Sequence, residues 1–344
     1  MRIIVEMGHP GHVHHFKNMI WELEKKGHKV KICTADKEVA LNLLDAYGFK
    51  YEVLGKNHGS GFIKKIPLLI KFELKMLNIA TKFKPDLFVC RGSPISAHVS
   101  KILSKKSISF NDTEHTKVID KYTFPLLDRI ITPSCFKLSL GAKQIRYNGY
   151  TELAYLHPEY FKPNPKILEE LGFCENDTFI VLRFVSWNAH HDVGQHGIRD
   201  KIEFVKKLEK YGRVLITSEG QLSPELEKYK IRISPEKLHD LLYYATLYIG
   251  EGATTASECA VLGTHAIYVN TLRLGYTDEE EYRYGLVYNF SDPNTMEKDA
   301  FNKAVELLEK PDLISEGKKK RERLLEDKID VTAFMVKCIE QYQD

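Results

Sequence analysis

Residues 247–270 read LYIGEGATTASECAVLGTHAIYVN and carry the strongest structural signal in the sequence. The apolar run LYIG is typical of a buried strand, and the turn with Gly250 and Gly252 leads into small and hydroxyl-bearing residues that are typical of a helix start. A second apolar run, AIYVN, follows Gly263. A strand, a glycine turn, a helix and another strand in this order predict a βαβ unit with parallel strands.

The same turn has the chemistry of an anion site. Glycine lets the backbone approach a ligand closely, and the free N–H groups of a helix N-terminus favour an anion such as a diphosphate. Thr254 and Thr255 could donate to the same phosphate oxygens, and Glu258 could accept from ribose hydroxyls one turn later. The alternative is an ordinary helix start in which Thr and Ser only cap the helix. The Walker pattern is absent, which disfavours a P-loop ATPase or kinase.

Short apolar runs alternate with amphipathic segments on both sides of the stretch HPEYFKPNPK, residues 157–166. This alternation predicts βαβ units and parallel sheets, so we expect an α/β protein with two Rossmann-like, doubly wound lobes facing across a cleft. The predicted lobes are residues 1–160 and 161–323. A helical pattern at 324–344 could pack back on the first lobe. Ligands of such sheets bind outside the carboxyl ends of the strands.

The composition excludes several classes of protein. Hydrophobic residues at 43% and charged residues at 28% are typical of a soluble globular protein. A net charge of +3 is too small to indicate nucleic acid as the main partner. The six cysteines contain no CxxC pair and are expected to be reduced core thiols. No apolar stretch approaches the ~18 residues of a membrane span, so we expect a cytoplasmic protein, whose oligomeric state the sequence does not indicate.

Four histidines, His9, His12, His14 and His15, crowd the turn and helix start that follow the first predicted strand. A helix N-terminus favours a neutral imidazole, which could deprotonate an acceptor hydroxyl near neutral pH. His12 is therefore the first candidate for a catalytic base. The alternative is a zinc site, but this spacing supplies only part of the three or four ligands that zinc needs. His14 and His15 are expected to be framework or surface residues.

Two further polar segments follow predicted strands. SFNDTEH, residues 109–115, could bring Asp112 and Glu114 into the cleft for acid–base chemistry, although it also fits a capped helix start. RFVSWNAHHDVGQHG, residues 183–197, carries Arg183, Ser186 and His190.

The motifs resemble those of a known superfamily. Gly252-Ala253, Thr255, Ser257-Glu258 and Gly263 resemble the nucleotide-sugar signature of the GT-B superfamily, in particular the lipid-linked N-acetylglucosaminyltransferase of peptidoglycan synthesis. The turn GHPGHV, residues 8–13, resembles the N-terminal loop of that enzyme, and both Gly11 and His12 match. The whole sequence also resembles the DUF354 family, which shares GHPGHVHHF, NDTEH and GEGATTASE.

The resemblance implies a GT-B-like fold and an enzyme that typically needs no bound metal, so no cofactor is expected. The glycine turn would bind the diphosphate of a nucleotide-sugar, and Glu258 would bind the ribose. The implied catalytic candidates are His12, Asp112, Glu114 and His190. The implied nucleotide-binding candidates are Gly11, Arg183, Ser186, Glu219, Gly252, Ala253, Thr254, Thr255, Ser257 and Glu258.

The resemblance favours a glycosyltransferase that moves a sugar from a nucleotide donor, expected to be a UDP-sugar, to a lipid-linked or surface-glycan acceptor. A nucleotide-sugar 2-epimerase or hydrolase, similar to the UDP-N-acetylglucosamine 2-epimerase, competes with it and would use Asp112, Glu114 and His190. A non-catalytic nucleotide-sugar binding protein is the third alternative. Thr264-His265 replaces the usual proline, and the glutamine-rich segment that recognises the sugar is missing from residues 271–285, so the donor stays open.

Residues 62–84 combine six lysines with many large apolar side chains and a single acidic residue, Glu73. A basic amphipathic helix can lie on an anionic membrane surface, where each lysine contributes ~1 kcal/mol. Such a contact would place the protein at the inner face of the membrane, near a lipid-linked acceptor. The alternative is a helix that packs on the core while its lysines extend into water.

Overall fold

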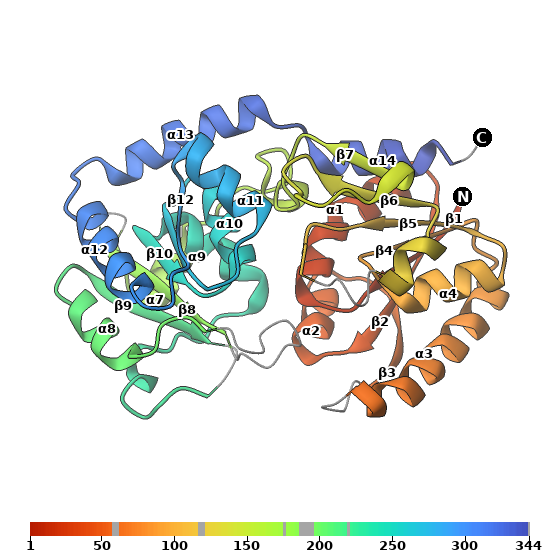
Figure 1. Ribbon diagram of the computed structural model, residues 1–344, viewed down its shortest axis with the longest axis horizontal. Coiled ribbons are helices and arrows are strands. Elements are labelled where there is room, and N and C mark those ends of the chain that lie inside the picture. Colours follow the sequence, from red (N-terminus) through yellow and green to blue (C-terminus); the bar gives the residue numbers. More distant parts are fainter. Residues whose placement is uncertain (57–61, 116–120, 175–176, 186–195, 219–220, 343–344) are drawn as a thin grey trace. The chain divides into compact units, whose positions relative to one another are not determined.

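The computed structural model describes residues 1–56, 62–115, 121–174, 177–185, 196–218 and 221–342. It divides into two compact units, one formed by Met1–Tyr155 with Ile329–Asp344 and the other by Leu156–Lys328 (Figure 1). The first boundary lies a few residues before the 160/161 boundary expected from the sequence. The second lies after residue 324, because Leu324 is fully buried within a helix of the second unit.

The first unit is built on a seven-stranded parallel sheet with the order β3-β2-β1-β4-β5-β6-β7. Its strands are β1 (Arg2–Met7), β2 (Lys29–Asp36), β3 (Tyr51–Lys56), β4 (Leu87–Cys90), β5 (Lys106–Phe110), β6 (Arg129–Pro133) and β7 (Gln144–Tyr147). Its main helices are α1 (Pro10–Lys25), α2 (Glu38–Ala46), α3 (Phe62–Phe83), α4 (Pro94–Ile102) and α14 (Val331–Glu340). The short helix α6 (Leu153–Leu156) lies at the boundary of the units.

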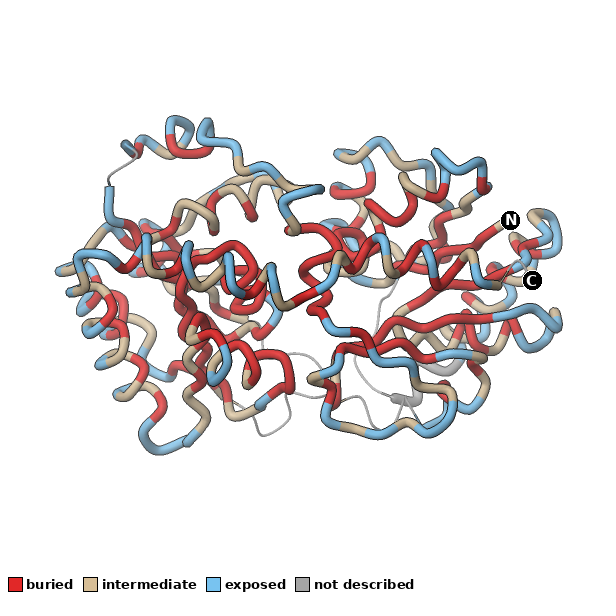
Figure 2. The backbone as a smooth tube through the Cα atoms, turned by 90° about the horizontal axis from the view of Figure 1, so that it is seen from above, coloured by how far each residue is buried: buried red, intermediate tan, exposed pale blue. Residues whose placement is uncertain are grey.

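Helices cover both faces of this sheet. On one face, Phe72 and Met76 of α3 pack with Ile4 and Phe88 of the sheet, and α4 packs beside α3. Side chains alternate along a strand, so the equally buried Val5 faces the opposite side, which α1 covers. Figure 2 shows the resulting pattern, with buried residues along the extended runs of the chain and exposed residues on the outer turns of the helices.

Helix α3 has a second, outward face. Ile70 and Leu74 lie one turn apart and are 51% and 62% exposed. Lys71 and Lys75 are exposed beside them. Packing on the core, the alternative to a membrane contact, therefore accounts for the inner face of α3 but not for the apolar side chains on its outer face. No helix within the described residues is both long and apolar enough to cross a membrane.

The second unit contains a five-stranded parallel sheet with the order β12-β11-β10-β8-β9. Its strands are β8 (Phe179–Phe184), β9 (Arg213–Ser218), β10 (Leu247–Gly250), β11 (Ala266–Val269) and β12 (Val287–Phe290). Its helices are α7 (Lys166–Leu171), α8 (Lys201–Leu208), α9 (Leu238–Tyr244), α10 (Ala253–Leu262), α11 (Gly275–Glu279), a π-helix (Glu280–Tyr284), α12 (Met296–Leu308) and α13 (Leu313–Asp327).

Helices α8 and α12 pack on one face of the second sheet, where they bury Leu182 and Ile249. Helix α10 contacts α9, α11 and α13 on the other side and is buried from Thr255 to Leu262. The stretch at 247–270 therefore forms the predicted strand, turn, helix and strand at the centre of this unit.

The strand orders place two switch points, positions at which the chain reverses its direction of winding through the sheet. In the first unit this point lies between β1 and β4, and in the second unit between β8 and β10. The loops at the carboxyl ends of these strands are where open α/β sheets bind ligands. Both the histidine turn after β1 and the glycine turn after β10 follow such strands.

Candidate functional site

The glycine turn of the second unit ends in an open helix N-terminus. Gly252 is the N-cap of α10 and provides no side chain to cap it. A Cβ added to Gly252 would have a Val185 methyl carbon at 3.8 Å as its nearest contact, so space is left above the turn. Thr254 is exposed at this start, whereas Ala253 and Thr255 are buried. The backbone N–H groups and the Thr254 hydroxyl are therefore placed to meet an anion.

Glu251 fixes the backbone around this turn, a role that the sequence analysis did not predict. Its Oε2 accepts a hydrogen bond from the N–H of Val185 at 3.0 Å, and its Oε1 accepts one from the N–H of Ile198 at 2.9 Å. Gly197 approaches this carboxylate so closely that an added Cβ would lie 2.5 Å from Oε1. Glu251 is 1% exposed, so it acts as an internal brace between β10 and β8.

Ser257 and Glu258 are both buried on the same helix. Ser257 is fully buried and donates to Glu280 at 2.5 Å. Glu258 is 5% exposed, and its Oε1 lies 2.9 Å from Nε2 of His239 on α9. The Ser257 hydroxyl is thus engaged in an internal hydrogen bond, and Glu258 is held by a partner that the sequence analysis missed.

Arg183 is the register partner of Gly250 and lies at the carboxyl end of β8, beside the glycine turn. Three other candidates, Ser186, His190 and Glu219, lie outside the described residues. Gly11 lies in the first unit, in the first turn of α1.

The four histidines of the first unit have different surroundings. His9 is exposed and caps α1 by accepting from the N–H of Gly11 at 3.1 Å. The buried His14 has its Nδ1 3.3 Å from the Tyr47 hydroxyl. Within the described residues there is no group of three or more His, Cys, Asp or Glu side chains placed to hold a metal.

His15 lies in an aromatic setting beneath the turn. It is 1% exposed, stacks on Phe16 with ring centroids 4.7 Å apart, and contacts Phe110 edge to face. Burial, followed by the positive charge of Arg91, lowers its pKa well below the usual range. Both ring nitrogens are buried without a hydrogen-bond partner. His15 is therefore a neutral framework residue.

His12 lies at the start of α1 and is partly exposed. Loss of hydration lowers its pKa well below the usual range, and the positive charge of Arg91 acts in the same direction. The ring is therefore neutral at pH 7. Its Nδ1 accepts from the N–H of Gly8 at 3.2 Å, which leaves the proton of the neutral ring on Nε2. In this arrangement His12 presents a donor, and action as a base requires the contact with Gly8 to change.

Asp112 forms a buried ion pair with Arg91, which follows β4. Burial acts to raise the pKa of Asp112, but the charge of Arg91 and hydrogen bonds from Thr151 and Arg91 outweigh it and lower that pKa. Thr113 also donates to Asp112 at 3.0 Å. Asp112 is therefore ionised and held by three neighbours, which suits a structural charge better than a group that exchanges protons.

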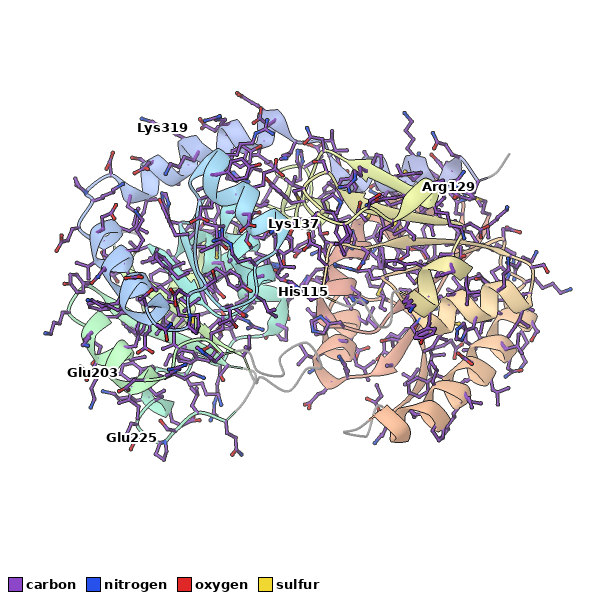
Figure 3. The ribbon with its side chains drawn as sticks, in the orientation of Figure 1. His115, Arg129, Lys137, Glu203, Glu225 and Lys319 are labelled. Atoms are coloured by element: carbon purple, nitrogen blue, oxygen red, sulfur yellow. The ribbon has the colours of Figure 1, made fainter. Side chains whose placement is uncertain are left out.

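Glu114 is also engaged internally. It is 5% exposed, and its Oε1 accepts from the backbone N–H of Lys137 at 3.0 Å. Figure 3 places Lys137 and His115 toward the edge of the first unit where β5 and β6 end, and Arg129 toward the opposite end of β6. The carboxyl ends of the central strands thus gather His12, Arg91, Asp112 and Glu114, as expected for a parallel sheet.

A second buried carboxylate joins β1 to α4. Glu6 is 7% exposed and accepts from the Ser93 hydroxyl at 2.7 Å and from the N–H of Ser96 at 3.1 Å. Burial raises its pKa. Glu6 is the only polar signal of this contact within RIIVEM, apart from the arginine at the start of the strand.

The family model of "Protein of unknown function (DUF354)" matches residues 1–342. The chain belongs to the DUF354 family. A relative in this comparison, the uncharacterized protein MJ0665 of Methanocaldococcus jannaschii, is 26% identical over 272 residues, which cover 75% of this chain and 79% of the relative.

Solved structures show the fold of this DUF354 protein. The UDP-GlcNAc 2-epimerase from Neisseria meningitidis, bound to UDP-GlcNAc, is similar with a TM-score of 0.71 and 12% identity, over 99% of this chain and 100% of that chain. The glycosyltransferase SsfS6 of Streptomyces sp. SF2575, complexed with thymidine diphosphate, has a TM-score of 0.63 and 15% identity, over 99% of each chain. The predicted GT-B-like α/β fold is thereby confirmed.

Proposed function

We propose that this protein is a glycosyltransferase that uses a nucleotide-sugar, expected to be a UDP-sugar, as its donor. The glycine turn and the start of α10 bind the diphosphate through backbone N–H groups and Thr254. The open N-terminus of α10, with Gly252 as its N-cap, is consistent with this role. Structures with the same fold that hold UDP-GlcNAc or thymidine diphosphate support a nucleotide ligand.

His12 acts as the base in this proposal. It accepts the proton of the acceptor hydroxyl while the acceptor oxygen forms a bond to the anomeric carbon of the sugar. The bond from that carbon to the diphosphate breaks, and the nucleoside diphosphate leaves with the electron pair. The nitrogen that takes this proton is Nδ1, once its hydrogen bond from the N–H of Gly8 has opened. The observation that carries the proposal is the position of His12 at the start of α1, directly after β1 and beside the switch point of the first sheet, where open α/β sheets bind ligands.

The state of the carboxylates favours transfer over epimerisation. Epimerisation needs groups that remove and return protons, and the sequence suggested Asp112, Glu114 and His190 for this role; His190 lies outside the described residues. Asp112 has a lowered pKa and an ion pair with Arg91, whereas Glu114 accepts a backbone N–H. Transfer needs a single base and uses neither carboxylate for proton exchange.

The acceptor in this proposal is a lipid-linked molecule at a membrane surface. The outward face of α3 combines the exposed Ile70 and Leu74 with Lys71 and Lys75. Apolar side chains can enter the headgroup region, while lysines remain at the level of the anionic phosphates. This face would hold the protein at the membrane surface where a lipid-linked acceptor lies.

The test has a binding arm and a turnover arm. Thermal stabilisation by UDP-, GDP-, CDP- and dTDP-sugars identifies the donor, because a selective ligand raises the unfolding midpoint. Release of the nucleoside diphosphate is then measured with that donor and vesicles that contain a polyprenyl-linked sugar, which offers free hydroxyl groups as the acceptor. We expect release that requires the vesicles and is lost in His12→Ala, while donor binding is unchanged.

His9→Ala is the matched control, since His9 caps the same turn but is exposed. It should retain most of the turnover. Conversion of the donor without any acceptor would identify an epimerase or hydrolase instead. Binding without turnover, or loss of donor binding in His12→Ala, would overturn the catalytic role of His12.

A further inference from the structure

The helix that follows the glycine turn also carries one member of a buried glutamate–histidine pair. Glu258 lies on the second turn of α10, and its side chain is 7% exposed. His239 lies in the first turn of α9, and its side chain is 3% exposed. The Nε2 of His239 and the Oε1 of Glu258 are 2.9 Å apart. An ionised carboxylate only accepts hydrogen bonds, so the imidazole N–H is the donor.

The pair is held firmly by its surroundings. Helices α9 and α10 pack directly against each other, and the ring of Phe161 meets the ring of His239 edge to face. A free glutamate side chain has several rotatable bonds, whereas the bond from the buried imidazole fixes the position of Oε1 and so limits the orientations of the carboxylate. Burial would be unfavourable for this charge without hydrogen-bond donors, and His239 supplies one.

We propose that His239 is a positioning residue that orients the Glu258 carboxylate toward the ribose hydroxyls of the nucleotide. This inference rests on the proposed nucleotide site at α10. A carboxylate has two oxygens that together accept about four hydrogen bonds, so one carboxylate can accept from an imidazole and from ribose hydroxyls at the same time. The consequence is selectivity: the site prefers a ribonucleotide over the 2′-deoxy analogue, and His239 is needed for that preference.

The test measures the dissociation constants of UDP and 2′-deoxy-UDP for the full-length protein by calorimetry, or those of the matching pair if the donor panel selects another base. A hydrogen bond from a hydroxyl to a charged group gives a preference of roughly ten- to a hundred-fold for the ribonucleotide. His239→Phe keeps an aromatic ring of similar size but removes the donor. It should reduce the preference to less than about threefold, by the loss of that same oriented bond.

His239→Gln is the conservative variant, because its amide can donate from nearly the same place. It should retain most of the preference, whereas His239→Asn, whose amide is too short to reach Glu258, should not. His157→Phe is the matched control: His157 lies in the same unit, and its ring contacts Tyr160. The preference should be unchanged in this variant.

The ratio of the two dissociation constants is the readout because both ligands meet the same protein. A general loss of stability weakens both and leaves the ratio unchanged, and the Gln and Asn variants decide the matter if His239→Phe does not fold. An unchanged ratio in the Phe and Asn variants, with UDP still bound, would overturn the role of His239 alone. Absence of nucleotide binding to the unsubstituted protein would overturn the proposed function and this inference together.

Discussion

Replacing Asp112 by asparagine should lower the free energy of unfolding of the first unit by about 3–5 kcal/mol. The side chains of Arg91 and Asp112 are only 13% and 9% exposed, so the substitution leaves the guanidinium charge buried beside a neutral amide. The hydration lost on burial is then no longer compensated by an opposite charge. A typical domain is stable by about 5–15 kcal/mol, so the loss is a large fraction of the total.

The assay is urea unfolding followed by Trp21 fluorescence. The chain has two tryptophans, Trp21 and Trp187, so a Trp187→Phe background leaves one reporter in the first unit. Trp21 stacks on Phe49 with ring centroids 5.2 Å apart, and this contact is lost on unfolding. The difference in midpoint, multiplied by the slope, gives the change in free energy.

Glu52→Gln is the matched control in the same unit. Glu52 pairs with Lys31 at 3.5 Å, but the two side chains are 47% and 35% exposed, so the loss should be less than about 1 kcal/mol. The double variant Arg91→Met/Asp112→Leu removes both charges and should be more stable than Asp112→Asn alone. A loss of stability in Asp112→Asn no larger than that in Glu52→Gln would show that the buried ion pair contributes no more than the exposed one.

The pH dependence of this penalty has a definite sign. The folded protein holds the pKa of Asp112 below its usual value of 3.8, so the stabilisation is fully present above that value. It is lost as the pH falls through the folded pKa, because the native carboxylate must then take up a proton. The penalty of Asp112→Asn should therefore be constant from pH 7 to about 5 and should shrink below pH 4.

Three further predictions concern other parts of the chain. Burial lowers the pKa of His265 from 6.5 to about 4, so only the unfolded chain binds a proton between these values, and the free energy of unfolding should fall by about 3 kcal/mol from pH 7 to pH 4. In His265→Phe this pH-dependent fall, measured by urea unfolding, should be absent. Gly250→Ala should lower the thermal midpoint and reduce the free energy of unfolding by about 1–3 kcal/mol, because the added Cβ would lie 2.2 Å from the buried hydroxyl of Tyr248. Gly8→Ala, whose Cβ would have nothing within 4 Å, should leave the midpoint nearly unchanged. Leu74→Glu should reduce co-sedimentation with anionic vesicles about tenfold or more, because it removes an apolar contact and adds a repelling charge. Val39→Glu, at a 47% exposed site on α2, is the control and should leave co-sedimentation unchanged. Equal effects of the two variants would exclude a specific role for α3.

The fold could be predicted because its signals are local. Apolar runs such as RIIVEM and LYIG become buried strands, and the glycines after them become the turns at the carboxyl ends. The period of hydrophobic residues decides strand or helix within a short window. The boundary near residue 324 was harder to place, because α13 and α14 are two helices separated only by a short break after Asp327.

The partners of the site residues could not be predicted, because they come from distant parts of the chain. Glu258 meets His239, which is 19 residues away, and Asp112 meets Arg91, which is 21 residues away. Glu251 reaches Val185, which is 66 residues away. Strand order and helix packing create these pairs, and neither is encoded in a short motif.

The four histidines of the first unit are close in sequence but differ in their surroundings. Four imidazoles within seven residues suggest one metal site, yet helical geometry turns successive side chains by about 100°. His15 consequently enters the aromatic core, whereas His9 stays in water as a cap. The sequence pattern could not show that the four histidines have such different surroundings.

The distribution of charge in the first unit separates the proposed base, His12, from the two carboxylates near it. Both carboxylates accept hydrogen bonds from neighbouring groups, Asp112 from Arg91 and Glu114 from the backbone N–H of Lys137. Burial lowers the pKa of His12, and the same Arg91 charge acts in the same direction. Arg91 thus favours the ionised form of Asp112 and adds to the preference of His12 for its neutral form. Arg91→Met should therefore raise the pKa of His12 and move the acidic limb of any pH–rate profile to higher pH, a shift that a purely structural ion pair would not produce.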